Sequence, residues 1–381
     1  MKSYLKGLVT ASFGAFMLLA ASSAHADALS TPSLTGPLAA NPNPLSFDSG
    51  FGTIYVTGAI SGLALYQTNH TQVPGDHETL LDFTNGQVSI QKTDGLVQFY
   101  IQAGEYSLPS LGLPYVRATT NTNATFGAVP LAYLKIAPTD TFNIEAGKLP
   151  TLIGAEYTFT FENLNIERGL LWNEEPAISR GVQGNYTWGS LAFSLAFTDG
   201  AYTNRYNQLS GSVGYTINST DTVSFVGSGD LGKVENSFAP VANEEVYNLI
   251  WAHTAAPWTI SSYAQYTNVP AGGLPATSTW GAAVLANYAF DTNWSLGGRV
   301  EYLKQSSGYD PALYGHGSSA WSFTVTPTYQ YKLLFARADL SYVTTNHLSF
   351  FSSQAAPGPG FGTSGTETGQ FRALMEMGIL F

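Results

Sequence analysis

The chain has 381 residues and a formal net charge of −11, and only 11% of its residues are charged while 13% are aromatic. A soluble secreted enzyme of this size would usually carry more surface charge, so the composition argues against that class. The acidic balance argues against nucleic-acid binding, which needs a basic surface. The sequence contains no cysteine, which excludes disulfides and thiolate metal sites.

Residues 1–26 have the pattern of a cleaved export signal. Two lysines precede an apolar run over 7–21, and a small-x-small cleavage site ends at Ala26. The run is too short to be a transmembrane anchor. We therefore expect the mature chain to begin at Asp27. Residues 27–50, rich in Pro, Ser and Asn, are expected to form an irregular lead-in.

Residues 51–381 have the pattern of one all-β domain, without helical periodicity over any useful length. Apolar residues such as Leu191, Phe193 and Leu195 alternate with small or polar ones, which is the period of a β-strand. We predict a transmembrane antiparallel β-barrel of about 16 strands. The candidate strands are 52–66, 79–92, 95–106, 129–137, 141–149, 178–187, 190–199, 209–217, 222–230, 244–254, 258–268, 278–290, 294–306, 321–331, 333–343 and 369–381.

Tight turns and long connections alternate along this domain. Outer-membrane barrels have that asymmetry, with short periplasmic turns and long external loops. A closed sheet pairs every backbone group, as lipid requires, and side chains do not fill a barrel of this width. We therefore expect a water-filled lumen. The long connections are 67–78, 107–128, 150–177, 200–208, 231–243, 269–277, 307–320 and 344–368.

The connection 150–177 is the third long loop and is unusually rich in charge. In general porins the third external loop folds inward and narrows the pore, where facing charges set a transverse field. Its many apolar residues favour inward folding, because so many would not remain in water. The alternatives are a solvated external loop, or strands extended by Tyr157, Phe159 and Phe161. The candidate constriction residues are Glu156, Glu162, Glu167, Arg168, Glu174, Glu175 and, at the start of the next strand, Arg180.

A second group of charges falls on the polar parity of the strands. Residues two apart on a strand point the same way, so Arg299 and Glu301 share one face, as do Arg337 and Asp339. An outward charge at the centre of the membrane would be costly, which favours inward placement. The alternative is an ion-pair ladder that only strengthens the wall. The candidate wall residues are Glu145, Arg299, Glu301, Arg337, Asp339, Arg372 and Glu376.

The final strand alternates and ends in Phe381. This end resembles the C-terminal signal by which the assembly machinery of bacterial outer-membrane barrels recognises its substrates. The alternative is the edge strand of a soluble sheet.

Three stretches resemble the OmpL-like β-barrel porins of Gram-negative bacteria. They are Gly147-Lys148-Leu149-Pro150-Thr151-Leu152-Ile153-Gly154-Ala155-Glu156, Arg168-Gly169-Leu170-Leu171 and Arg180-Gly181-Val182. At the level of pattern the resemblance covers nearly the whole mature chain. It implies an outer-membrane channel, surrounded by outer-membrane lipid, and names no solute.

The main functional hypothesis is passive diffusion of small hydrophilic solutes or ions. We find no catalytic constellation and expect no cofactor and no metal site. The alternatives are a barrel enzyme, such as a phospholipase or protease, and a plugged structural or adhesive barrel. A homo-oligomer is compatible with the sequence. The surplus of acids in 150–177 predicts a preference for cations.

Overall fold

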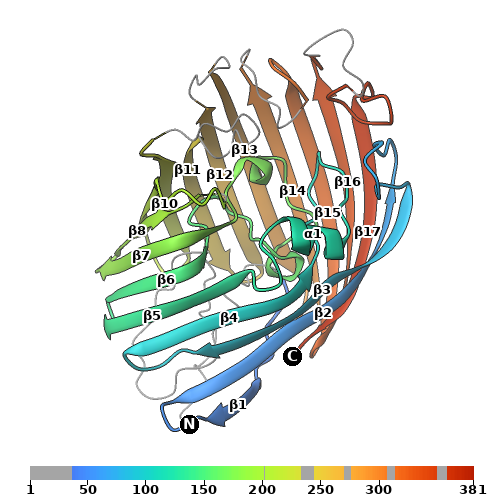
Figure 1. The fold of residues 1–381 in the computed structure, drawn as a ribbon. Helices are drawn as coiled ribbons and strands as arrows, with labels where there is room; N and C mark the ends of the chain where they lie inside the picture. Colours follow the sequence, from blue (N-terminus) through green and yellow to red (C-terminus); the bar gives the residue numbers. More distant parts are fainter. Residues whose placement is uncertain (1–36, 201, 233–243, 270–275, 307–313, 350–357) are drawn as a thin grey trace.

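The computed structural model describes residues 37–200, 202–232, 244–269, 276–306, 314–349 and 358–381. The expected export signal and residues 27–36 of the expected lead-in lie outside these ranges. In the described part, seventeen strands form one antiparallel sheet, and all but the first close it into a barrel (Figure 1). Closure is made by the last strand against the second, with Leu380 opposite Ala59.

Each of the sixteen predicted strands overlaps one strand of this barrel, so the predicted fold class is confirmed. The alternation of apolar and polar residues therefore locates every spanning strand. The strands are β2 (Thr53–Gln67), β3 (Thr79–Lys92), β4 (Val97–Tyr106), β5 (Leu131–Thr139), β6 (Phe142–Pro150), β7 (Ile178–Trp188), β8 (Leu191–Thr198), β9 (Gln208–Thr216), β10 (Asp221–Asp230), β11 (Glu245–Ala255), β12 (Trp258–Val269), β13 (Thr277–Ala289), β14 (Trp294–Gln305), β15 (Ser319–Tyr331), β16 (Leu334–Asn346) and β17 (Gly369–Leu380).

One strand was not predicted. β1 (Leu45–Asp48) lies in the range expected to be irregular and pairs with the first four residues of β2. β17 ends further along β2, where the backbone of Phe381 exchanges two hydrogen bonds with Gly58, at 2.8 and 3.0 Å. β1 therefore covers the edge of β2 that β17 leaves open, since unpaired strand edges are unfavourable.

The described helices are short, and those of the long connections are α1 (Ala118–Ala124), η1 (Thr160–Glu162) and η2 (Leu171–Glu174). Of the helices in the described ranges, none combines the length and hydrophobicity needed to span a membrane. α1 belongs to the β4–β5 connection, whereas η1 and η2 belong to the β6–β7 connection.

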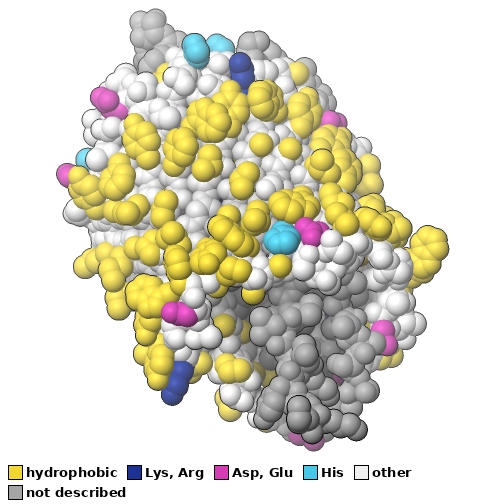
Figure 2. Space-filling view, turned by 180° about the vertical axis from the view of Figure 1, so that it is seen from behind, with side chains coloured by type: hydrophobic (Ala, Val, Ile, Leu, Met, Phe, Trp, Pro, Cys, Tyr) yellow, Lys and Arg dark blue, Asp and Glu magenta, His cyan; other side chains and the backbone are white. Residues whose placement is uncertain are grey.

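The outer face of the barrel is apolar. On β15 the side chains of Trp321 and Phe323 are exposed, whereas Ser322 and Thr324 are buried against the interior. Figure 2 shows one such face, with hydrophobic side chains spread across it and few charged groups among them. The pleat of each strand thus separates an apolar outside from an inside that holds the polar and charged groups.

Candidate functional site

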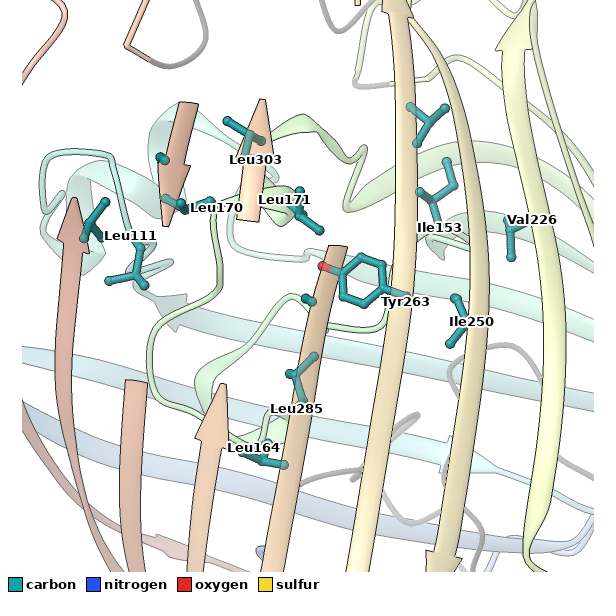
Figure 3. Packing of buried hydrophobic residues seen from close by; sticks show 14 of the residues in the cluster. Leu111, Ile153, Leu164, Leu170, Leu171, Val226, Ile250, Tyr263, Leu285 and Leu303 are labelled. Carbon is teal, nitrogen blue, oxygen red and sulfur yellow. The ribbon is translucent and has the colours of Figure 1, made fainter. Parts of the chain in front are cut away.

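The β6–β7 connection folds into the barrel. Every residue from 158 to 171 is buried. In Figure 3, Leu164, Leu170 and Leu171 lie among inward-facing wall residues such as Leu285, and the same residues form one apolar cluster. Removing this much apolar surface from water favours the inward position.

Arg299 on β14 ties the connection to the wall. Its buried guanidinium donates from Nη1 to Oε1 of Glu156 at 2.6 Å and to the backbone carbonyl of Glu167 at 2.7 Å. Its Nη2 donates to the hydroxyl of Thr324 at 3.2 Å, and its Nε lies 3.4 Å from Glu301. One side chain therefore joins two strands to two points of the connection.

Arg372 on β17 makes a second attachment. Its Nη1 lies 2.8 Å from Oε1 of Glu167 and donates to the carbonyl of Ser110 at 2.9 Å. Its Nη2 donates to the carbonyl of Leu113 at 2.6 Å, and its Nε donates to Gln67 at 2.9 Å. Since Ser110 and Leu113 belong to the β4–β5 connection, Arg372 holds two internal segments together.

Arg337 on β16 makes a third attachment. It stands directly opposite Glu376 of β17 in the register, and its Nη2 lies 2.6 Å from Oε2 of that residue. The same guanidinium donates to the carbonyls of Asn163 at 2.9 Å and Thr160 at 2.8 Å. The other carboxylate oxygen of Glu376 accepts a hydrogen bond from the Thr160 hydroxyl at 2.7 Å.

Two further wall acids accept hydrogen bonds from backbone amides of the connection. Oε2 of Glu301 accepts from the amide of Leu170 at 2.9 Å. Oδ2 of Asp339 accepts from the amide of Glu167 at 2.9 Å, and its Oδ1 accepts from the hydroxyl of Thr326 at 2.6 Å. Burying a carboxylate without such donors would be costly, so the amides compensate both acids.

Of the charges that share a strand face, Arg299 and Glu301 do form an ion pair, at 3.4 Å, but it is not the shortest pair that Arg299 makes. The three wall arginines pair most closely with acids of the connection or of a neighbouring strand: Arg299 with Glu156, Arg337 with Glu376, and Arg372 with Glu167. Residues two apart on a strand are separated by roughly 6.6 Å, whereas directly opposite residues of neighbouring strands have Cβ atoms about 4.5–5.5 Å apart. Cross-strand and loop partners are therefore within easier reach than same-strand partners.

The remaining charges of the connection have other surroundings. Glu162 accepts a hydrogen bond from the backbone amide of Phe159 at 3.1 Å. Burial raises the pKa of the Glu162 carboxyl to about 8. Glu174 accepts the hydroxyl of Thr267 on β12 at 3.0 Å. Burial first, and then neighbouring carboxylates, raise the pKa of Glu175 well above its ordinary value.

Arg168 is the one base within the connection, and its side chain is 0% exposed. Its guanidinium carbon lies 5.0 Å from the ring centroid of Trp172, and among the described residues none accepts a hydrogen bond from its side chain. Burial lowers the pKa of this guanidinium to about 10, against the raising effect of Glu156 and other acids. The stacked ring of Trp172 and the nearby acids together compensate the buried charge.

Two predicted residues lie apart from this group. Arg180 has the parity of the exposed Val182, bonds to Asp199 at 2.6 Å and stacks over a tyrosine ring. Glu145 on β6 lies 3.8 Å from Lys135 on β5, and both side chains are partly exposed. The other predicted charges contact each other or belong to the buried connection. Arg180 and Glu145 are not part of that group of interacting charges.

The sequence did not indicate the part played by the β4–β5 connection. Its contribution is made by backbone carbonyls, at Ser110 and Leu113, and a carbonyl leaves no trace in residue type. The side chains of Ser61 and Asn85 donate hydrogen bonds to Oε1 of Glu376. The sequence could have indicated them only as polar residues at inward-facing positions of β2 and β3.

The comparisons with known proteins agree with this architecture. The family model described as "Putative beta-barrel porin-2, OmpL-like" matches residues 53–381. No curated protein matches the chain.

Several solved outer-membrane proteins are similar in structure. An anion-selective porin from Comamonas acidovorans has a TM-score of 0.59 and 11% identity, over 86% of this chain and 99% of that porin. OmpT of Vibrio cholerae has a TM-score of 0.57 and 12% identity, over 89% and 99%. OmpF of Salmonella typhi, in complex with daunomycin, has a TM-score of 0.57 and 14% identity, over 88% and 100%. At such identities the likeness shows the fold. With its family match over residues 53–381, the chain belongs to the OmpL-like β-barrel porin family and lies in the outer membrane of a Gram-negative bacterium.

Proposed function

We propose that the chain is a passive pore for small hydrophilic solutes or ions, and that residues 150–177 form its constriction. The observation that carries the proposal is the attachment of this segment across the interior. Arg299, Arg337 and Arg372 hold it from β14, β16 and β17 of the wall. Solutes would cross down their gradient with no covalent step.

A polar stretch of the opposite wall supports an aqueous path beside the segment. Lys135 and Glu145 face inward on β5 and β6 and are partly exposed. Asn143 and Asn185, on β6 and β7, are partly exposed and bonded to each other at 2.8 Å. Such groups would replace part of the hydration of a passing solute.

The charge balance of the constriction favours cations. Glu156 and Glu167 are offset by Arg299 and Arg372, so their charges largely cancel. Burial raises the pKa of Glu162 and of Glu175, so among the remaining acids of the segment the surplus of negative charge rests on Glu174. In a narrow wet space about a Debye length across, roughly 8–10 Å, its field would be only partly screened.

Single-channel recording in planar bilayers tests the pore. Stepwise insertion currents are expected, and a salt gradient should give a reversal potential of cationic sign. Glu174→Gln should shift that potential toward anions, more strongly at low salt. The control is Glu105→Gln, on β4, where the carboxylate accepts a hydrogen bond from Thr119 of α1 and lies outside the segment. Purified protein that inserts but never conducts would contradict the proposal.

A largely closed barrel is the second candidate. The apolar cluster around the segment includes residues of strands that carry none of the three arginines, such as Val226 on β10 and Ile250 on β11. An apolar bridge of this kind would exclude water from much of the lumen. The same recordings separate the two candidates, because a closed barrel would insert without current.

We also propose a homo-oligomer in the membrane. The V. cholerae OmpT structure is described in a trimer form, at 12% identity to this chain. Chemical crosslinking of the protein in native outer membranes should then give multiples of its own mass. Exclusively monomeric protein would contradict this proposal.

A further inference from the structure

The residues that precede β1 contact the inner wall of the barrel. The backbone of Ala39 is held on both sides by one side chain, that of Gln330 on β15. Its amide N–H donates to Oε1 of Gln330 at 2.7 Å, and its carbonyl accepts from Nε2 at 2.8 Å. This is the two-bond pattern by which one strand recognises another, and it does not depend on the side chain of the residue held.

Leu38 supplies an apolar anchor next to this clamp. Its side chain is 2% exposed and belongs to the inward-facing cluster that includes Ala59, Phe335 and Leu380. Those three residues lie on β2, β16 and β17, toward the end of the barrel where the short turns are. In porins that end faces the periplasm. Leu38 is therefore inside the periplasmic mouth.

Gln330 also points inward. It shares the parity of the buried Thr326 and Thr328, whereas its neighbour Tyr331 is exposed on the outer face. The clamp consequently lies on the lumen side of β15, beside the short turn that leads to β16.

The path from the clamp to β1 runs along the periplasmic end of the sheet. β1 pairs with β2 on the edge beyond the end of β17, whereas Gln330 is on β15, so β16 lies between them. Two strand spacings amount to roughly 9–10 Å. The six peptide units from Ala39 to Leu45 can span at most about 20 Å, so the chain can make this connection.

We propose that residues 37–43 form a strap along one side of the periplasmic mouth that narrows the exit of the pore. The strap is fixed at one end by the pairing of β1 with β2 and at the other by Leu38 and the Gln330 clamp. The proposal rests on the pore function proposed above. It adds a second restriction, at the opposite end of the barrel from the external loops.

The first test uses thiol labelling, which the absence of natural cysteines makes clean. Ala39→Cys is placed in the full chain, and a bulky cationic methanethiosulfonate is added from the periplasmic side during bilayer recording. The control is Ser219→Cys, an exposed residue of the short β9–β10 turn. A loss of current for Ala39→Cys alone is expected, and equal currents before and after labelling would overturn the strap.

The second test releases the strap without shortening the chain. Leu38→Asp combined with Gln330→Glu removes the anchor and the donor to Ala39, and Thr328→Ala serves as the inward control on the same strand. A higher single-channel conductance is expected only for the double variant. An unchanged conductance in protein that still inserts would overturn the strap.

The two proposals fail in different ways. A parent protein that conducts, with no response to either test, contradicts the strap alone. A parent that is silent while the released variant conducts supports the strap as a plug. Silence in both contradicts the strap together with the pore.

Discussion

Removing the Arg299 side chain should release the β6–β7 connection from the wall. Arg299→Met retains much of the length and the apolar stem but leaves the carboxylate of Glu156, now without the partner at 2.6 Å, in a buried site. Breaking a buried ion pair by removing one partner costs about 3–5 kcal/mol. The connection is the part that can move, because the strands on either side are held by the closed sheet.

Trypsin reports this release, because Arg168 lies within the connection and is fully buried when it is docked. If cleavage proceeds through the open form, its rate follows the population of that form. Each 1.4 kcal/mol is a factor of ten, so the rate at Arg168 should rise by roughly two to three and a half orders of magnitude. Fragment masses from protein folded in detergent give the site and the rate.

Lys135→Met is the matched control. Lys135 is also an inward base of the wall, but it is partly exposed, lies 3.8 Å from its acid and has no partner in the connection. Cleavage at Arg168 should stay at the parent rate in this variant. If Arg299→Met is also cleaved no faster than the parent, the ion pair does not hold the connection, and the reasoning is refuted.

Three other predictions follow from the packing and charges of the interior. Gly58→Val should lower the temperature at which heat-modifiable migration is lost, because a Cβ at Gly58 would come within 2.4 Å of the Phe381 ring and 2.6 Å of a β3 carbonyl. Gly62→Val should leave that temperature unchanged, because a Cβ at Gly62 would meet a single atom, at 3.6 Å. Gly169→Ala should speed trypsin cleavage at Arg168, since its Cβ would lie 2.0 Å from Oε1 of Glu301, whereas Gly184→Ala, with open space around it, should leave the rate unchanged. Raising the pH from 7 to 9 should shift the reversal potential toward cations: burial raises the pKa of Glu162 to about 8, so this carboxyl is neutral below that pH and gains negative charge above it. Glu162→Gln should remove the part of the shift centred near 8, and an identical titration in both proteins would contradict the assignment.

The spanning strands were predictable because each carries its own evidence. Alternation such as that of Trp321, Phe323 and Val325 against Ser322 and Thr324 specifies a strand and its two faces without knowledge of its neighbours. β1 carries no such evidence. Its four residues lie in a Pro- and Asn-rich region, and they form a strand only because β2 offers an unpaired edge beyond Phe381.

The charges of the interior were predictable as a set but not as pairs. Arg337 and Glu376 are both on inward parity, yet their contact depends on the register of β16 against β17, which places them directly opposite. Register is a property of the assembled sheet, and a shift of β17 by one residue against β16 would have turned Glu376 outward. The attachment of Arg372 to backbone carbonyls likewise depends on how two connections fold together.

α1 likewise depends on contacts with the barrel rather than on its own sequence. Its sequence, Ala118–Ala124, contains threonines and asparagines, which are weak helix formers, so no helix was expected there. Its first amide donates to Asp82 of β3 at 2.9 Å, and its residue Thr122 accepts from the amide of Tyr106 at 3.0 Å. The barrel wall thus supplies the bonds that fix this turn of helix.

Two kinds of contact, buried ion pairs and apolar contacts, hold the β6–β7 connection inside the barrel. A buried ion pair contributes little net stability, because desolvation of both charges offsets their attraction. The apolar contacts of Leu164, Leu170 and Leu171 must therefore provide most of the free energy that docks the connection. The bonds of Arg299 are directional and join it to particular oxygens, so they determine where the docked connection lies. It follows that replacing both members of the first pair with apolar residues, as in Arg299→Met with Glu156→Met, should restore much of the protection of Arg168 that Arg299→Met alone removes. The position of the connection, and with it the width of the constriction, would then be less well defined, and the open-channel current noisier, than in the parent protein.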